Sequence, residues 1–205
     1  MKRQEGFTIV ELLIVIVIIA ILAAFIVVSY NGIQQRAENS KTVTAVQAYK
    51  KALMQYAVEN NAYPSISSTA CLGEDYPNVI GAGANKCAGA QYPVSENTTF
   101  NNAIRKYFAG GKIPLPSLKK QMRSSYGFVG AFFVSDNSMT LNGQSQPWWI
   151  VYMYLGNQAK CPIGPVYRSV SPNWSDYLFP EVTYTNQNGT DGVECYTPLP
   201  DPKNL

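Results

Sequence analysis

Glu11 is a residue whose type and position call for a chemical explanation. It opens an apolar run, since residues 12–28 contain no charged and no strongly polar side chain. An acid at the centre of a membrane span costs about 2.5–3.5 kcal/mol on insertion scales. The cost is lower near the end of a span, but a carboxylate in this position still requires a partner.

Four cysteines are the other candidates for chemistry: Cys71, Cys87, Cys161 and Cys195. No pair has C-x-x-C spacing, so a structural zinc site is the less favoured alternative. An even number of cysteines after a membrane-targeting segment is typical of disulfides. Three pairings are possible. We favour Cys71–Cys87 and Cys161–Cys195, because each closes one loop region rich in Gly, Asn or Pro.

The composition argues against an enzyme. Histidine is absent from the 205 residues, which removes the commonest general base and the commonest transition-metal ligand. Acidic residues are scattered, and Glu74-Asp75 is the only adjacent pair. We therefore expect no catalytic activity, no cofactor and no metal site. The net charge of +3 comes without a basic block, so nucleic acid is not expected as an obligate ligand.

The apolar segment of residues 7–28 must position Glu11. As a helix it would be about 33 Å long, enough to span a bilayer. Lys2 and Arg3 precede it, which predicts a cytoplasmic amino end. The segment is longer than the apolar part of a secretory signal peptide, and no small-x-small cleavage pattern follows it. A plain single-pass anchor would explain its hydrophobicity, but not Gly6, Phe7 and Glu11.

The stretch GFTIVELLIV, from Gly6 to Val15, follows a short basic leader. At these residues the chain resembles the type IV filament family, which comprises type IV pilins and the pseudopilins of type II secretion and DNA-uptake systems. The resemblance implies that a prepilin peptidase removes residues 1–6 by cutting between Gly6 and Phe7, and then N-methylates Phe7. Residues 7–30 would remain as a transmembrane and filament-core helix.

The resemblance also assigns a role to Glu11. Phe7 and Glu11 are one helical turn apart and share a face. Cleavage creates a cationic amine at Phe7, and Glu11 would neutralise the amine of an adjacent subunit when helices bundle. The alternative is an acid that only complements the positive end of the helix dipole.

The remaining residues, 31–205, form the predicted head, and residues 31–60 continue the helix. Val46, Tyr49, Leu53 and Tyr56 recur at helical spacing. Asn31-Gly32 is the predicted weak point because Gly is unfavourable inside a helix, and the resemblance implies that the helix loosens near there on assembly. Asn60 and Pro64 predict its end.

Further elements follow in the head. Asn97 is expected to cap a short helix that ends at Gly110-Gly111. Strands are predicted over residues 126–134, 138–141, 148–155 and 182–185. In the strand of residues 148–155, one alternating set should face the long helix and the other the surface. For the tandem Trp148-Trp149, core packing is favoured over a carbohydrate platform.

Two weaker motifs occur in the chain. Residues 186–194 are rich in oxygen ligands, but their glycine spacing is wrong for an EF-hand calcium loop, and Asn-Gly and Asp-Gly turns explain them equally well. Three sequons, at Asn97, Asn173 and Asn188, match glycosylation sites and are read as coincidental in a chain with a bacterial-type leader.

The sequence therefore predicts an α+β, type IV pilin-like protein, with a long amino-terminal helix against a small antiparallel sheet. The predicted function is that of a structural subunit of a type IV pilus, in extracellular filaments that serve adhesion, twitching motility or DNA uptake. The alternative is a pseudopilin of a type II secretion or competence system; a monomeric membrane-anchored binding module is the third possibility.

The same interpretation predicts location and partners. The precursor would lie in the cytoplasmic membrane, and the mature subunit in a pilus on the cell surface. Its partners would be copies of itself, the prepilin peptidase, an inner-membrane assembly platform and, before assembly, the membrane. Nucleic acid would be bound only through the assembled fibre.

Overall fold

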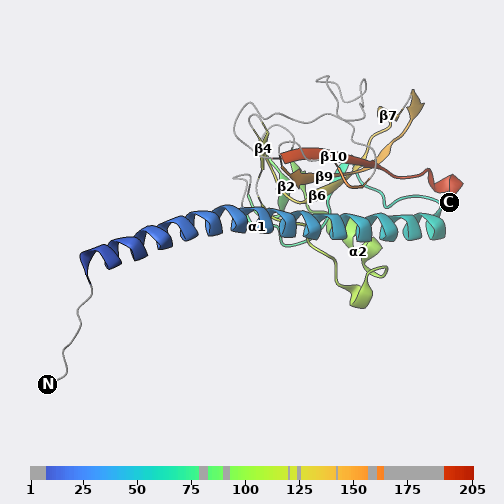
Figure 1. Cartoon of the computed structure of the whole chain (residues 1–205). Coiled ribbons are helices and arrows are strands. Elements are labelled where there is room, and N and C mark those ends of the chain that lie inside the picture. Colours follow the sequence, from blue (N-terminus) through green and yellow to red (C-terminus); the bar gives the residue numbers. More distant parts are fainter. Residues whose placement is uncertain are drawn as a thin grey trace. The chain divides into compact units, whose positions relative to one another are not determined.

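The computed structural model describes residues 8–78, 83–89, 93–119, 121–123, 126–141, 143–156, 161–163 and 192–205 (Figure 1). For residues 24–31, 121–123, 126 and 192 the structure describes the backbone only. The chain divides into two compact units, Met1–Ala37 and Glu38–Leu205, each described by itself. The helices are α1 (Ile9–Asn60) and α2 (Thr98–Arg105), with 3₁₀ turns η1 (Ala109–Gly111) and η2 (Pro202–Asn204).

The strands, in chain order, are β1 (Thr69–Cys71), β2 (Lys86–Ala88), β3 (Val94–Ser95), β4 (Gln121–Arg123), β5 (Tyr126–Phe128), β6 (Ala131–Ser135), β7 (Thr140–Leu141), β8 (Gln144–Ser145), β9 (Trp148–Leu155) and β10 (Gly192–Pro198). They form a main sheet in the order β1-β6-β9-β10, a smaller sheet in the order β3-β2-β5-β4, and the hairpin β7-β8. All pairs are antiparallel. The predicted α+β class is therefore confirmed.

The helix α1 ends where the sequence predicts. Its last residue is Asn60, and Asn61 takes a left-handed φ of 52°. Pro64 then disfavours helical backbone at the residue before it. The helix continues through Asn31 and Gly32 without a break, so the loosening expected there on assembly is not present in the single chain.

In the second unit, α1 buries one face against the head (Figure 1). Val46, Tyr49 and Leu53 have no exposed surface, and they pack with Ile104 of α2 in one apolar cluster. The Tyr49 ring lies edge-on to the Phe108 ring, with 5.1 Å between the ring centroids. Each fully buried large apolar side chain stabilises the fold by about 1.5–3 kcal/mol, so this stripe holds the helix on the head.

The short helix α2 begins as predicted. Asn97 is its N-cap, and the side-chain oxygen of Asn97 accepts a 2.9 Å hydrogen bond from the Phe100 N–H. This bond satisfies one of the amide groups that the first turn of a helix leaves without a partner. Phe100 and Ile104 are the apolar residues that α2 buries.

Strand β9 has the predicted bounds, but its predicted orientation is wrong in one respect. Ile150 and Tyr152 pack in the cluster with α1, as expected. The other alternating set was expected at the surface, yet Trp149 and Val151 have no exposed surface and belong to a second apolar cluster. The main sheet is therefore covered on both faces, because the smaller sheet packs over the face that α1 leaves free.

The single strand predicted over residues 126–134 is two strands. Tyr126–Phe128 belongs to the smaller sheet as β5, and Ala131–Ser135 belongs to the main sheet as β6. Gly130 lies between them with a φ of +68°. A backbone in this region cannot continue an extended strand, so the chain passes from one sheet to the other.

Two other strand predictions differ from the structure. Of residues 138–141, only Thr140 and Leu141 form a strand, in the hairpin β7-β8. Residues 182–185 lie outside the described residues, and so does the oxygen-rich loop up to residue 191. The edge strand β10 was not predicted. It pairs with β9 over seven registered residues, from Gly192 opposite Leu155 to Pro198 opposite Trp149.

Candidate functional site

The first turn of α1 holds Glu11 in a capping box. Thr8 precedes the helix, and its backbone N–H and its hydroxyl donate to Glu11 Oε2, at 2.8 and 2.7 Å. In return the Glu11 N–H donates to Thr8 Oγ1 at 3.2 Å. The reciprocal bonds satisfy amide groups at the helix start and give the carboxylate defined local partners.

Thr8 is a site residue that the sequence analysis missed. The signal was present as Thr8-Ile9-Val10-Glu11, which matches the S/T-x-x-E pattern of a capping box. The structure therefore supplies a local role for Glu11 at the helix end. Its predicted pairing with the amine of another subunit stays a prediction, and Gly6 and Phe7, the predicted cleavage and methylation residues, lie outside the described residues.

The helix surface beyond Glu11 is apolar and exposed. Every large hydrophobic side chain from Ile9 to Leu22 is exposed, by between 46% for Val15 and 80% for Ile9. Exposed apolar surface of this extent marks a region that contacts other molecules or lipid. The segment therefore has the apolar surface that its predicted role requires, which is burial among helices of the same kind.

Within the described part of the chain, no helix is both long and apolar enough to cross a bilayer. The predicted transmembrane segment, residues 7–30, includes Phe7 and the side chains of residues 24–30, which are outside the description. Its role in a membrane stays a prediction.

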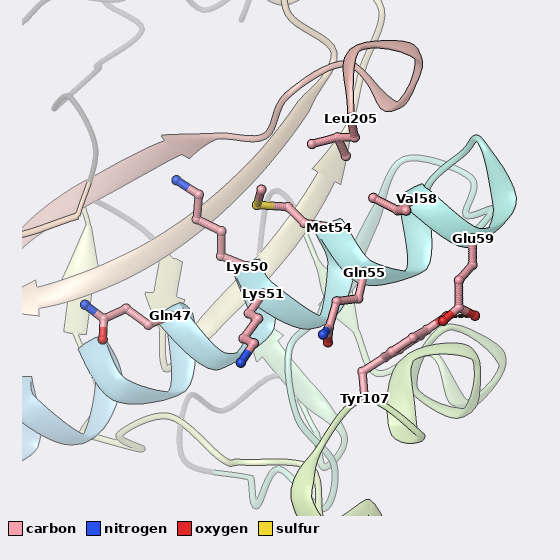
Figure 2. Close-up of a pocket in the computed structure, with 9 residues that line it drawn as sticks. All are labelled: Gln47, Lys50, Lys51, Met54, Gln55, Val58, Glu59, Tyr107 and Leu205. Atoms are coloured by element: carbon pink, nitrogen blue, oxygen red, sulfur yellow. Dashed lines mark hydrogen bonds between the residues drawn. The ribbon is translucent and has the colours of Figure 1, made fainter.

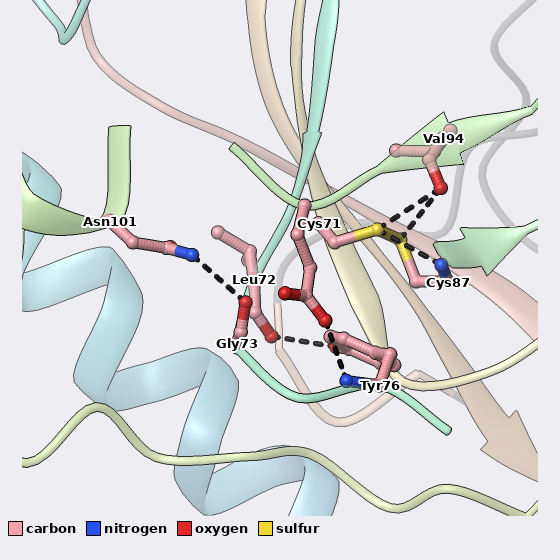
Figure 3. Close-up of a disulfide and its surroundings, with 8 residues drawn as sticks. Cys71, Leu72, Gly73, Tyr76, Cys87, Val94 and Asn101 are labelled. Carbon is pink, nitrogen blue, oxygen red and sulfur yellow. Dashed lines mark hydrogen bonds between the residues drawn. A yellow bond between two sulfur atoms is a disulfide. The ribbon is translucent and has the colours of Figure 1, made fainter. Parts of the chain in front are cut away.

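The cysteines lie as the favoured pairing requires. Cys71 is bonded to Cys87, and Cys161 to Cys195. Figure 3 shows the first disulfide in the second apolar cluster, beside Val94 and close to Tyr76. The second disulfide ties Cys161 to the edge strand β10. In these pairs the four cysteines have no free thiolate.

A shallow groove lies on α1 in the second unit (Figure 2). Its lining combines apolar, amide and charged side chains: Gln47, Lys50, Lys51, Met54, Gln55, Val58, Glu59, Tyr107 and Leu205. Hydrogen bonds from Lys106 and Tyr107, both 2.7 Å long, hold the pKa of the Glu59 carboxyl below its ordinary value. The lowered pKa and the two hydrogen bonds make Glu59 a weak base, which does not suit general-base catalysis.

The described residues offer little for catalysis or metal binding. Among them, no group of three or more His, Cys, Asp or Glu residues is placed to hold a metal ion. The expectation that the chain is not an enzyme stays a prediction. The features that lie together on α1, a capped carboxylate followed by exposed apolar side chains, are suited to association with other helices.

Comparison with known proteins finds a family motif in the amino-terminal segment. The family described as "Prokaryotic N-terminal methylation motif" matches residues 1–27. The motif and the matching relatives support the type IV pilin and pseudopilin family for the amino-terminal part of the chain. This pilin-like chain is 40% identical over 65 residues to the type II secretion system core protein G of Vibrio cholerae, across 32% of this chain and 44% of that protein.

Two more relatives match a similar share of the chain. The core protein G of Aeromonas hydrophila is 41% identical over 64 residues, 31% of this chain and 45% of that protein. A fimbrial protein of Neisseria meningitidis is 36% identical over 67 residues, 33% of this chain and 39% of that protein. The pilin-like chain thus aligns with less than half the length of these relatives. No solved structure matches the chain.

The comparisons change the order of the two functional interpretations. Core proteins G of several bacteria match the pilin-like chain, whereas the Neisseria protein is fimbrial. They therefore favour the pseudopilin, which was the alternative, over the pilus subunit. The processing motif fits a membrane-anchored precursor, but relatives of the secretion type do not support a location on the cell surface.

Proposed function

We propose that the chain is a pseudopilin, the subunit of a short filament in a type II secretion-type system. The observation that carries the proposal is the 40% identity to a type II secretion core protein G over 65 residues. The match is to proteins of secretion systems, and the family motif at residues 1–27 covers the capping box and the start of the exposed apolar helix.

The subunit works through its amino-terminal helix. A prepilin peptidase cuts between Gly6 and Phe7 and methylates the new amine. An inner-membrane assembly platform then brings subunits together, and the exposed apolar side chains between Ile9 and Leu22 pass from lipid to contacts with neighbouring helices. One oxygen of Glu11 is held by Thr8, and the carboxylate offers its charge to the amine of an adjacent subunit.

A pilus subunit is the second candidate function. The observation that favours it is the 36% identity to the Neisseria fimbrial protein over 67 residues. Both candidates use the same amino-terminal chemistry and differ in the role of the assembled fibre. A pilus would reach the cell surface and serve adhesion, twitching or DNA uptake, whereas a pseudopilus supports export of other proteins.

Mass spectrometry of the intact, non-reduced protein tests the shared part of the proposal. The expected mature chain starts at N-methylated Phe7 and is four hydrogens lighter than the fully reduced form, because it contains two disulfides. A mature chain that starts at Met1 would contradict both candidates. Substitution of Gly6 separates them from a monomeric binding module, since only a filament subunit needs processing.

Deletion of the gene in its host distinguishes the two fibres. For a pseudopilin, secreted proteins should accumulate inside the deletion strain while surface fibres and twitching persist. For a pilus subunit, surface fibres should disappear from the sheared fraction while secretion continues. Complementation with the intact gene is the control, and a deletion strain normal in both assays would contradict both functions.

A further inference from the structure

Asn39 connects α1 to the end of the main sheet through two hydrogen bonds. Its side-chain Nδ2 donates to the carbonyl oxygen of Leu155 at 2.8 Å, and its Oδ1 accepts from the N–H of Leu155 at 2.7 Å. The two residues are 116 positions apart in the sequence. Asn39 is 7% exposed, so this contact is shielded from water.

The amide of Asn39 takes the place of a strand residue. The Met153 N–H donates to the Gly130 oxygen, at the beginning of β6. Leu155 is two residues further along β9, so its N–H and C=O point to the same edge, where β6 no longer provides a partner. A planar side-chain amide presents an N–H donor and a carbonyl acceptor side by side, as an opposing residue of an antiparallel strand does. Asn39 therefore extends the hydrogen-bond ladder from the helix.

The position of Asn39 on α1 makes this contact informative. Among the described side chains of α1, Asn39 is the first that is buried, and Thr42 is the next. Thr42 Oγ1 accepts a hydrogen bond of 3.2 Å from the Ser117 N–H. Among the described side chains of α1, the first buried ones thus make directional hydrogen bonds, and the buried apolar side chains begin with Ala45 and Val46.

Directional contacts specify one position of a helix where apolar contacts accept several. A slip of one residue moves a helix by about 1.5 Å and turns it by about 100°. That rotation would also turn the apolar stripe away from its cluster, but smaller shifts, which apolar contacts tolerate, would still break both bonds between Asn39 and Leu155. Their buried groups would then lack partners, which is costly. Buried polar pairs are best supported in proteins as devices that fix register.

We propose that Asn39 is a positioning residue for assembly, which fixes the register of α1 on the head. The inference rests on the proposed function as a filament subunit. In a helical filament every contact repeats with the same rise and rotation. Contacts made by α1 and contacts made by the head can both be satisfied only if the helix has one register on the sheet.

The test compares two buried asparagines in the full-length chain, produced with its processing and assembly machinery. Asn39→Leu removes both bonds to Leu155. Asn101→Leu is the matched control, because Asn101 is also buried and its Nδ2 donates to the Gly73 oxygen at 3.0 Å, away from β9. Three quantities are measured: the melting temperature, hydrogen exchange at the Leu155 amide in detergent, and the processed subunit recovered in sheared filaments.

The expected result separates register from stability. Both variants should remain folded with lowered melting temperatures. Only Asn39→Leu should increase exchange at the Leu155 amide, by about tenfold for one lost hydrogen bond, and only it should lose filament formation. Wild-type filament yield from Asn39→Leu would overturn the proposal, as would an equal loss of filaments from Asn101→Leu.

The same experiment distinguishes this inference from the proposed function. If the unaltered chain forms no filaments under these conditions although it is processed, the proposed function fails, and the assembly role of Asn39 fails with it. If the unaltered chain assembles and Asn39→Leu also assembles, only the inference about Asn39 is wrong.

Discussion

At the scale of single residues, Glu11 combines two roles that substitution by glutamine separates. As part of the capping box it accepts hydrogen bonds from Thr8, and as an ionised acid it is proposed to meet the amine of another subunit. A glutamine in its place can still complete a capping box but carries no charge.

We therefore predict that Glu11→Gln and Glu11→Ala will both be cleaved and inserted but will both assemble poorly. The reason is that each removes the charge, although only the alanine removes the cap. The measurement is the fraction of processed subunit in sheared filaments. Normal assembly of Glu11→Gln together with failure of Glu11→Ala would assign Glu11 to capping alone.

Gly130 is a second residue whose environment permits a sharp prediction. It has a φ of +68°, and a Cβ built there would lie 2.6 Å from the Tyr76 hydroxyl oxygen. Tyr76 is buried and its hydroxyl donates to the Leu72 oxygen at 2.7 Å, so it has little room to move (Figure 3). Backbone strain of about 1–2 kcal/mol and overpacking of about 1–3 kcal/mol should add.

Gly130→Ala is thus expected to lower the free energy of unfolding by about 2–5 kcal/mol. Gly110→Ala is the control, because Gly110 has a similar φ of +62° but open space around it. That variant should cost only about 1–2 kcal/mol. Chemical denaturation measures both, and equal losses would show that the contact with Tyr76 is unimportant.

At the scale of elements, local sequence is sufficient to predict a helix when the residues that start it and bury it lie within one segment. The N-cap bond from Asn97 and the apolar residues of α2 lie within one short segment. Strand β9 shows the opposite case. Its apolar run predicts a strand, but which residues face α1 and which face the second cluster depends on β5 and its neighbours, which no local pattern contains.

The N-cap provides a prediction for α2. Asn97→Ala should lower the free energy of unfolding by about 0.5–2 kcal/mol, because the Phe100 N–H loses its acceptor. Asn102 is exposed within the same helix, so Asn102→Ala should change stability by less than about 0.5 kcal/mol. Thermal unfolding of the two variants provides the comparison. Similar losses would exclude capping as the cause.

At the scale of the whole molecule, the burial of tyrosines contributes to the response to alkaline pH. Desolvation raises the pKa of Tyr152 to about 12, although its hydroxyl has hydrogen-bonding partners in the backbone of Ile163. Burial also raises the pKa of Tyr63 and of Tyr76. In the unfolded chain each tyrosine titrates near pH 10.

Because the folded-state pKa is raised, the folded form retains the phenol proton longer than the unfolded chain. The contribution of Tyr152 is fully present below about pH 10 and is lost as the pH rises toward about 12, at about 1.4 kcal/mol per pH unit. Denaturation at a series of pH values should show this decline, and Tyr152→Phe should make it shallower. An unchanged slope in that variant would contradict the assignment.

The amino-acid sequence by itself determined the features that depend on neighbours in the chain. Helical spacing and Asn60-Asn61 specify α1 and its end, and the run of residues 148–155 specifies β9. The motif from Gly6 to Val15 carries the resemblance to the type IV filament family, and it lies within the residues that the family model matches. The capping box of Thr8 and Glu11 was also readable, since it spans one helical turn.

Only the tertiary structure decided which distant groups become partners. The bonds between Asn39 and Leu155 join positions 116 residues apart, and the two-sided burial of β9 requires a second sheet. All seven residues of strand β10 pair with β9, although no strand was predicted there. Local propensities are weak, whereas pairing and burial are strong and act between segments that only folding brings together.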